Sequence, residues 1–140
     1  LQLYVPCDYE THYFTIHEDP KFKNDLVRLA TFDLLVNNTD RKAGHVLVGK
    51  DGLIWAIDNS LCFHEEFKIR TVIWDFSGED IPKKLISDLT GIINKGVPEK
   101  ISELLNQNEI EALLQRTRAL ITNGSLPYDP SGRQVPWPLL

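Results

Sequence analysis

A single β-hairpin signal between helical patterns limits the folds that this chain can adopt. Two β-rich runs, residues 45–49 and 53–57, flank a turn that contains Asp51 and Gly52. Asp-Gly between such runs is typical of a tight antiparallel hairpin. A doubly wound parallel sheet needs repeated strand–helix units, which this sequence does not have. The expected fold class is therefore α+β and mainly helical.

Helical patterns occupy the stretches before and after the hairpin. Residues 25–36 are apolar almost all round, which predicts a helix that Asn24 caps and that is buried on most faces. Apolar residues then recur at helical spacing over residues 82–124. The prolines of residues 125–140 predict an extended tail, and we expect residues 135–138 to dock on the body because an exposed tryptophan is costly.

The N-terminal end predicts less regular structure. Apolar and polar residues alternate over residues 1–6, which predicts a strand that Pro6 ends. Residues 7–23 mix polar, aromatic and charged types without a period, and we expect a loop there. The sequence has no methionine and begins with Leu1, a residue before which initiator methionine is not normally removed. We therefore expect the chain to be part of a longer protein.

Composition argues against several classes of function. The 140 residues, 42% hydrophobic and 25% charged, suit one globular domain. A net charge of -5 argues against a nucleic-acid binder, because a phosphate backbone attracts a basic surface. No apolar run approaches the roughly 20 residues that cross a bilayer, so we expect no integral membrane segment. Cys7 and Cys62 suit free thiols in a reducing compartment, which predicts a cytoplasmic protein.

Two aspartates bracket the hairpin. Asp40 lies in the polar loop before it, and Asp58 follows its second strand. Because a hairpin brings its ends together, we expect both carboxylates and His45 to meet at one place. Phosphoryl transfer uses such a set: one carboxylate orients the attacking hydroxyl, and another holds a magnesium ion that bridges the nucleotide phosphates. Arg41 or Lys42 would stabilise the negative charge of the transition state.

Each of these residues also has a structural interpretation. Asp40 and Asp58 are common turn residues, and His45 suits a position inside a strand. Arg41 could instead pair with Asp33 or Asp58. A carboxylate inside an apolar helix needs a partner, so Asp33 would then orient the loop.

The loop and the hairpin resemble those of kinases. Protein kinases carry an H-R-D-x-x-x-x-N loop, a hairpin and a D-F-G element. Phosphatidylinositol 3- and 4-kinases use a variant, D-R-x-x-x-N, followed by an I-D-F-G-like element. This chain has Asp40-Arg41, His45 at the asparagine position, and Ile57-Asp58. It is similar to a bacterial phosphatidylinositol 3- and 4-kinase-like family over about residues 25–140, most closely at 36–45, 55–64, 70–74, 78–79 and 136–138.

The resemblance implies a fold as well as an activity. Residues 1–140 would be the C-terminal lobe of a protein-kinase-like fold, with residues 1–6 as the interlobe linker and 24–64 as the catalytic loop and hairpin. No glycine-rich loop or strand lysine for the nucleotide phosphates precedes Asp40. We therefore expect the N-terminal nucleotide lobe to lie upstream of Leu1, and this stretch to be inactive without it.

The resemblance also assigns roles to single residues. It implies that Asp40 is the catalytic aspartate and that Asp58 binds Mg²⁺ or Mn²⁺ for ATP. His45 replaces a metal-binding asparagine, although magnesium prefers oxygen, and Asn59-Ser60 replaces phenylalanine and glycine. Three functions stay open: an ATP-dependent phosphotransferase with an unknown acceptor, a non-catalytic kinase-fold binding or scaffolding module, and a metal-dependent phosphohydrolase.

Overall fold

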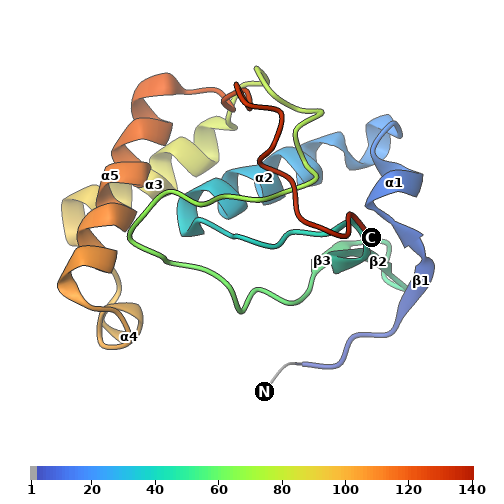
Figure 1. Ribbon diagram of the computed structural model, residues 1–140, viewed down its shortest axis with the longest axis horizontal. Coiled ribbons are helices and arrows are strands. Elements are labelled where there is room, and N and C mark those ends of the chain that lie inside the picture. Colours follow the sequence, from blue (N-terminus) through green and yellow to red (C-terminus); the bar gives the residue numbers. More distant parts are fainter. Residues whose placement is uncertain (1–2) are drawn as a thin grey trace.

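The computed structural model describes residues 3–140 as an α+β fold, which confirms the expected fold class in its general form. Leu1 and Gln2, and with them the start of the predicted strand and the expected upstream boundary, lie outside the described residues. The elements are shown in Figure 1, in the order β1 (Cys7–His12), α1 (Tyr13–Ile16), η1 (Pro20–Phe22), α2 (Lys23–Val36), η2 (Ala43–His45), β2 (Val46–Gly49), β3 (Ile54–Ala56), α3 (Lys83–Lys95), α4 (Glu99–Ser102) and α5 (Gln107–Asn123).

The predicted hairpin forms one side of a small antiparallel sheet. The strand order is β1-β2-β3, and Leu47 of β2 pairs with Trp55 of β3. The turn contains Asp51, whose carboxylate oxygens lie 3.2 and 3.1 Å from the indole Nε1–H of Trp55. His45 was expected at the start of the first strand, but it ends the short helix η2 instead. The hairpin is otherwise confirmed.

The N-terminal segment differs from its prediction. Residues 3–6 form no strand, and β1 follows them in a stretch that was expected to be a loop. β1 pairs with β2, from Cys7 opposite Gly49 to an irregular step near His12. Three of its six side chains are exposed and none is buried, so the strand lacks the apolar alternation that identifies a half-buried strand from local sequence.

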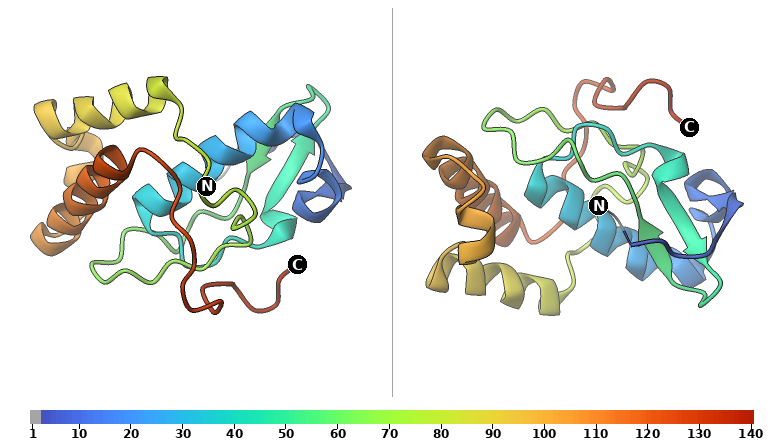
Figure 2. Two further views of the ribbon diagram at one scale, coloured as in Figure 1. Left: turned by 90° about the horizontal axis from the view of Figure 1, so that it is seen from above. Right: turned by 90° about the horizontal axis from the view of Figure 1, so that it is seen from below.

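Helix α2 occupies the centre of the fold, between the pair α3 and α5 on one side and the sheet on the other (Figures 1 and 2). Most of its apolar residues are buried as predicted, but Leu35 is only partly buried and Phe32 is 40% exposed. Asn24 was expected to cap the helix, but the helix begins at Lys23 and Phe22 is the N-cap residue. Leu26 and Ala30 belong to a core that continues into Val46 of β2 and Ile69 of the following loop. The sheet and the loops around it are thereby held against one helix.

The predicted helical region is confirmed by α3, α4 and α5. Asn106 caps α5, since its side chain accepts from the Glu109 N–H at 2.9 Å, and Gly124 ends the helix with φ of 66°. In the part of the chain that the structure describes, none of the helices has the length and apolar character needed to cross a membrane.

The C-terminal tail is irregular and docks on the body, although not through Trp137, which is 87% exposed. Pro136 is the buried residue, and the Gln134 carbonyl accepts hydrogen bonds from the Thr71 N–H at 3.0 Å and the Trp74 indole at 2.9 Å. Docking of residues 135–138 is thus confirmed at Pro136, but the reason given for it was wrong, because the tryptophan stays exposed and backbone hydrogen bonds hold the tail.

Candidate functional site

The candidate site begins where α2 ends. Asn37 caps the helix with φ of 55°, in the left-handed region that asparagine tolerates better than most residues. The Asn38 N–H donates to the Asp33 carbonyl at 2.9 Å, and the Asn38 side-chain oxygen accepts from the Asp40 N–H at 3.1 Å. The chain therefore turns directly from the helix into the loop that carries Asp40.

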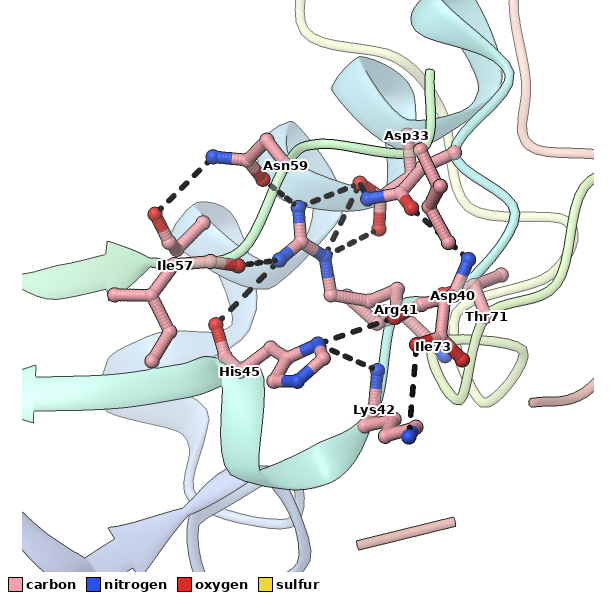
Figure 3. Close-up of polar contacts among 12 residues, drawn as sticks. Asp33, Asp40, Arg41, Lys42, His45, Ile57, Asn59, Thr71 and Ile73 are labelled. Atoms are coloured by element: carbon pink, nitrogen blue, oxygen red, sulfur yellow. Dashed lines mark hydrogen bonds and ion pairs between the residues drawn. The ribbon is translucent and has the colours of Figure 1, made fainter. Parts of the chain in front are cut away.

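The buried side chain of Arg41 holds this loop in place (Figure 3). Its guanidinium is fully buried and bonds to Asp33 of α2, with Nε 3.0 Å from Oδ2 and Nη2 2.9 Å from Oδ1. Forked pairing of this kind is the strong geometry for an arginine–carboxylate pair. Burial raises the pKa of the Asp33 carboxyl, and Arg41 and the Asn38 amide oppose that rise. The pairing with Asp33 that the sequence left open is thus confirmed.

Arg41 also connects the loop to the exit of the hairpin. Nη1 donates to the Ile57 carbonyl at 2.8 Å, and Nη2 donates to the side-chain oxygen of Asn59. Its backbone pairs with residues 70–72. The Arg41 N–H donates to the Arg70 carbonyl, and the Arg41 carbonyl accepts from the Val72 N–H. Arg41 therefore connects α2, the loop and the exit of the hairpin. Because it is fully buried, its guanidinium is not at a surface where it could touch a phosphate.

His45 lies beside the loop that carries Asp40 and Lys42 (Figure 3), and its other ring edge faces Asp58. Nδ1 is 3.1 Å from the Asp40 carbonyl oxygen and 3.4 Å from the Lys42 nitrogen, and Nε2 is 3.7 Å from Oδ2 of Asp58. The shorter Nδ1 contact favours the tautomer in which Nδ1–H donates to the Asp40 carbonyl. Nε2 then presents its lone pair on the side of Asp58, where a proton, a water or a cation would join the two groups.

The two carboxylates differ in their surroundings. The Asp58 side chain is 54% exposed, and its Oδ1 accepts from the Ser60 hydroxyl at 2.8 Å. Its backbone has φ of 51°, an uncommon conformation that aspartate adopts more often than most residues. The Asp40 side chain is 28% exposed, and its Oδ2 lies 3.5 Å from Nζ of Lys42. Asp40 meets His45 through its carbonyl, so its carboxylate is left to face the solvent side of the loop.

The donor set fits a divalent ion in part. Among residues 3–140, no three His, Cys, Asp or Glu side chains are grouped so as to hold a metal. His45 and Asp58 form a pair of candidate ligands 3.7 Å apart. Since Mg²⁺ binds ligands at about 2.1 Å, one ion can bridge this separation, with other positions left to water or phosphate oxygens. The carboxylate is the better of the two magnesium ligands.

Asn37 fixes the segment that follows the hairpin. Its amide nitrogen donates to the carbonyls of His64 at 3.0 Å and Glu66 at 2.7 Å, and its oxygen accepts from the Lys68 N–H at 3.0 Å. Arg116 of α5 adds a further contact to the His64 carbonyl at 3.3 Å. The sequence predicted only a helix break at Asn37. Two asparagines directly after an apolar helix were nevertheless a signal that their side chains form hydrogen bonds to the backbone.

Two clefts border the hairpin and the loop that carries Asp40. The first, the linker cleft, has a volume of about 420 Å³ and is lined by Leu3, Tyr4, Val5, Cys7, Tyr9, Leu47, Trp55, Ala56 and Ile57. The second, the loop cleft, has a volume of about 780 Å³ and is lined by Thr39, Asp40, Lys42, Leu61, Cys62, His64, Lys68, Ile69, Arg70, Arg133, Gln134 and Trp137. Asp40 thus opens on the loop cleft, while the residue before Asp58 lines the linker cleft.

Comparison with known proteins provides one relative. Protein Rv2133c of Mycobacterium tuberculosis is 38% identical over 116 residues, which cover 81% of this chain and 42% of that protein. The chain therefore spans less than half the length of this relative, and the relative's name states no activity. No protein-family model and no solved structure matches the sequence.

Proposed function

We propose that this chain is the phosphate-transfer part of an ATP-dependent kinase-like enzyme. The observation that carries the proposal is the position of His45, whose two ring nitrogens face Asp40 and Asp58 from the two ends of the hairpin. Nδ1 contacts the backbone carbonyl of Asp40, and Nε2 faces the Asp58 carboxylate. The Asp40 carboxylate lies beside Lys42 instead, so only one of the two carboxylates expected at His45 lies there. The acceptor, and an upstream lobe that would contribute to nucleotide binding, are part of the proposal.

In this proposal Asp40 accepts the proton of the attacking hydroxyl or orients that hydroxyl. The carboxylate lines a cleft wide enough for a small molecule, and it is partly exposed there. Lys42 lies 3.5 Å from the carboxylate and would hold it in place until an acceptor enters. A phosphate that approaches Asp40 would meet the same ammonium group, which supports a role of Lys42 in neutralising transferred charge.

Asp58 and His45 would hold the metal ion. Mg²⁺ at this position would supply electrostatic stabilisation of the nucleotide phosphates. The Ser60 hydroxyl orients one carboxylate oxygen of Asp58 and leaves the other toward His45. Residues of the chain thus set the direction of the carboxylate, and the pair at 3.7 Å presents one oxygen and one nitrogen to a shared ion.

The linker cleft is the proposed place of the nucleotide base. Apolar side chains of the hairpin and of residues 3–5 line this cleft. A flat aromatic base suits a mainly apolar cleft of this size. Its position next to Asp58 would direct the phosphates of a bound nucleotide toward the proposed metal ligands.

Phosphoryl transfer by the full-length protein tests the proposal. Incubation with labelled ATP and Mg²⁺ should label an acceptor, and Asp40→Asn should reduce that rate by about 100-fold or more, in the range of a general base. Asp88→Asn, on the exposed face of α3, is the matched control and should leave the rate unchanged. Undiminished transfer by Asp40→Asn would remove Asp40 from the mechanism, and release of phosphate without any acceptor would indicate a hydrolase.

A non-catalytic nucleotide-binding or scaffolding module is the second candidate function. It is favoured by the histidine at the expected asparagine position and by the absence, over residues 3–140, of a third metal-ligating side chain beside His45 and Asp58. Calorimetry on the same full-length protein separates the two functions. Magnesium-dependent nucleotide binding without any transfer would support the module over the enzyme.

A further inference from the structure

The C-terminal tail contacts the loop that carries Asp40. Figure 1 shows the tail, in red, running from the end of α5 toward the hairpin. Its backbone reaches the loop where the Leu139 carbonyl accepts a hydrogen bond from the Ala43 N–H at 2.8 Å. Ala43 is the first residue of η2, the short helix that ends with His45. The tail is therefore bonded to the element that carries one of the candidate metal ligands.

The Ala43 N–H depends on this bond. The first N–H groups of a helix have no partner within the helix, so another group has to accept from them. Ala43 is 0% exposed, which leaves no room for water to take the place of the Leu139 carbonyl. An unpaired N–H in the core is unfavourable. The tail therefore stabilises the conformation in which η2 begins at Ala43.

The tail also holds the segment that pairs with the loop. The Gln134 carbonyl accepts from the Thr71 N–H at 3.0 Å and from the Trp74 indole at 2.9 Å. Residues 70–72 pair in turn with the backbone of Arg41. Two of the segments that fix the loop, η2 and residues 70–74, are thus both bonded to the tail.

These contacts are few, and most of the tail is open to solvent. Pro136 is buried, with an exposed fraction below 2%, while Trp137 is 87% and Leu140 is 61% exposed. For residues 135–140, the hydrogen bond of the Leu139 carbonyl is the one found within the described chain. A segment with little buried apolar surface opens at a lower free energy than the core does. The tail can therefore detach while the rest of the fold stays closed.

We propose that residues 134–140 form a releasable strap whose docking positions His45. The candidate site is complete only while Pro136 is seated and the Leu139 carbonyl is bonded to Ala43. Pro136 and Leu139 are positioning residues, because they act on His45 through η2 and contact no reacting atom. This inference rests on the proposed function for the role of His45, and it adds a means of switching the same site off.

Release of the strap would change His45 in a defined way. Within η2 the His45 N–H donates to the Lys42 carbonyl at 3.1 Å, and the Val46 N–H donates to the Ala43 carbonyl. A single turn with so few bonds loosens when the bond at its start is lost. The His45 ring would then leave the Asp40 carbonyl, which now favours a proton on Nδ1. A free imidazole is mostly protonated at Nε2, so the lone pair facing Asp58 would be lost.

Amide hydrogen exchange in the full-length protein tests the strap, with ¹⁵N-labelled alanine to resolve single residues. Pro136→Gly removes the buried ring. We expect exchange at Ala43 to become faster by about tenfold or more, while exchange at the buried Ala30 of α2 stays within about twofold. Pro130→Gly makes the same change at an exposed proline of the tail, and it should leave both rates within about twofold.

The protonated nitrogen of His45 is the second measurement, since a merely structural tail would not change it. Long-range ¹H–¹⁵N spectra of ¹⁵N-histidine should show a proton on Nδ1 in the unmodified protein and in Pro130→Gly, and mostly on Nε2 in Pro136→Gly. An unchanged tautomer in Pro136→Gly, although exchange at Ala43 is faster, would overturn the positioning role. Unchanged exchange at Ala43, or an equal rise at Ala30, would overturn the strap itself.

Neither measurement needs a nucleotide, so both decide on the strap even if the protein transfers no phosphate. Where transfer is found, Pro136→Gly should lower its rate by about tenfold or more, because a displaced group costs catalysis steeply. Pro130→Gly should leave the rate unchanged. Transfer that Pro136→Gly leaves undiminished would overturn the strap and leave the proposed function in place. A strap that controls the His45 tautomer in a protein without transfer would have the opposite meaning.

Discussion

Two acid–base pairs lie within the candidate site, and they differ mainly in burial. Arg41 and Asp33 are 0% exposed and share forked hydrogen bonds, while the His45 and Asp58 side chains are 17% and 54% exposed and lie 3.7 Å apart. The first pair has no room for a ligand. The second leaves a nitrogen and an oxygen that face each other without a direct bond. Burial therefore distinguishes the pair that holds the loop from the pair that can act on a ligand.

The largest effect should come from breaking the buried pair. Arg41→Met leaves the Asp33 carboxylate buried without its partner, and we expect the free energy of unfolding to fall by about 3–5 kcal/mol. Urea denaturation followed by circular dichroism measures this change. Asp33→Leu combined with Arg41→Met should recover much of the loss, because no charge is then left in the core.

The same helix offers a matched control for that experiment. Arg28 and Asp25 of α2 form a pair of the same residue types at 3.5 Å, with side chains 62% and 41% exposed. Arg28→Met should change the free energy of unfolding by no more than about 0.5 kcal/mol, since exposed helical pairs contribute little. Similar losses from Arg28→Met and Arg41→Met would contradict the structural role given to the buried pair.

Changes in the exposed pair should affect function far more than stability. Asp58→Asn removes the proposed magnesium ligand, and we expect phosphoryl transfer by the full-length protein to fall by about 100-fold or more. The free energy of unfolding should change by less than about 1 kcal/mol, as for other exposed ion pairs. A radioactive transfer assay and urea denaturation on the same preparation measure both quantities. A variant that unfolds as easily as Arg41→Met would show that Asp58 belongs to the framework.

The contrast between the pairs also separates what local sequence can predict from what it cannot. The hairpin and α5 were predictable because Asp51-Gly52 and the helical spacing after Asn106 are short-range signals. Whether Arg41 pairs with Asp33 or with Asp58 was left open, because both carboxylates are within reach of a loop whose path was unknown. The left-handed turn at Asn37 sets the path of the loop after α2, and on that path the Arg41 guanidinium reaches Asp33.

Other features of the site depend on contacts distant in sequence. β1 was missed because its pairing partner is β2 and its exposed side chains show no apolar alternation. Docking of the tail was predicted, but its contact through Gln134 was missed because that residue acts through its backbone carbonyl, which any residue has. The loop cleft brings Arg70, from the middle of the chain, together with Arg133 of the C-terminal tail. No short motif contains both.

The smallest expected effect extends the comparison to a neutral group that lies beside the buried pair. Burial raises the pKa of the Cys62 thiol to about 11, with a further rise from Asp33 that Arg41 opposes. Because the thiolate is the nucleophile, its low population at pH 8 should make alkylation by iodoacetamide about 100-fold slower than that of an ordinary thiol with a pKa near 8.5. The rate should increase as the pH rises toward 11, since a raised pKa delays loss of the proton.

Mass spectrometry of a Cys7→Ser variant isolates Cys62 in that experiment. The same reaction in concentrated urea is the control, and there the rate at pH 8 should match that of a free thiol because the burial is lost. This variant changes neither charge nor contacts of the two acid–base pairs, so its folded structure should be retained. Because Cys62 lines the loop cleft and is partly exposed, the reagent can reach it, and the population of the thiolate limits the rate. Fast alkylation of the folded protein at pH 8 would therefore contradict the raised pKa of this thiol.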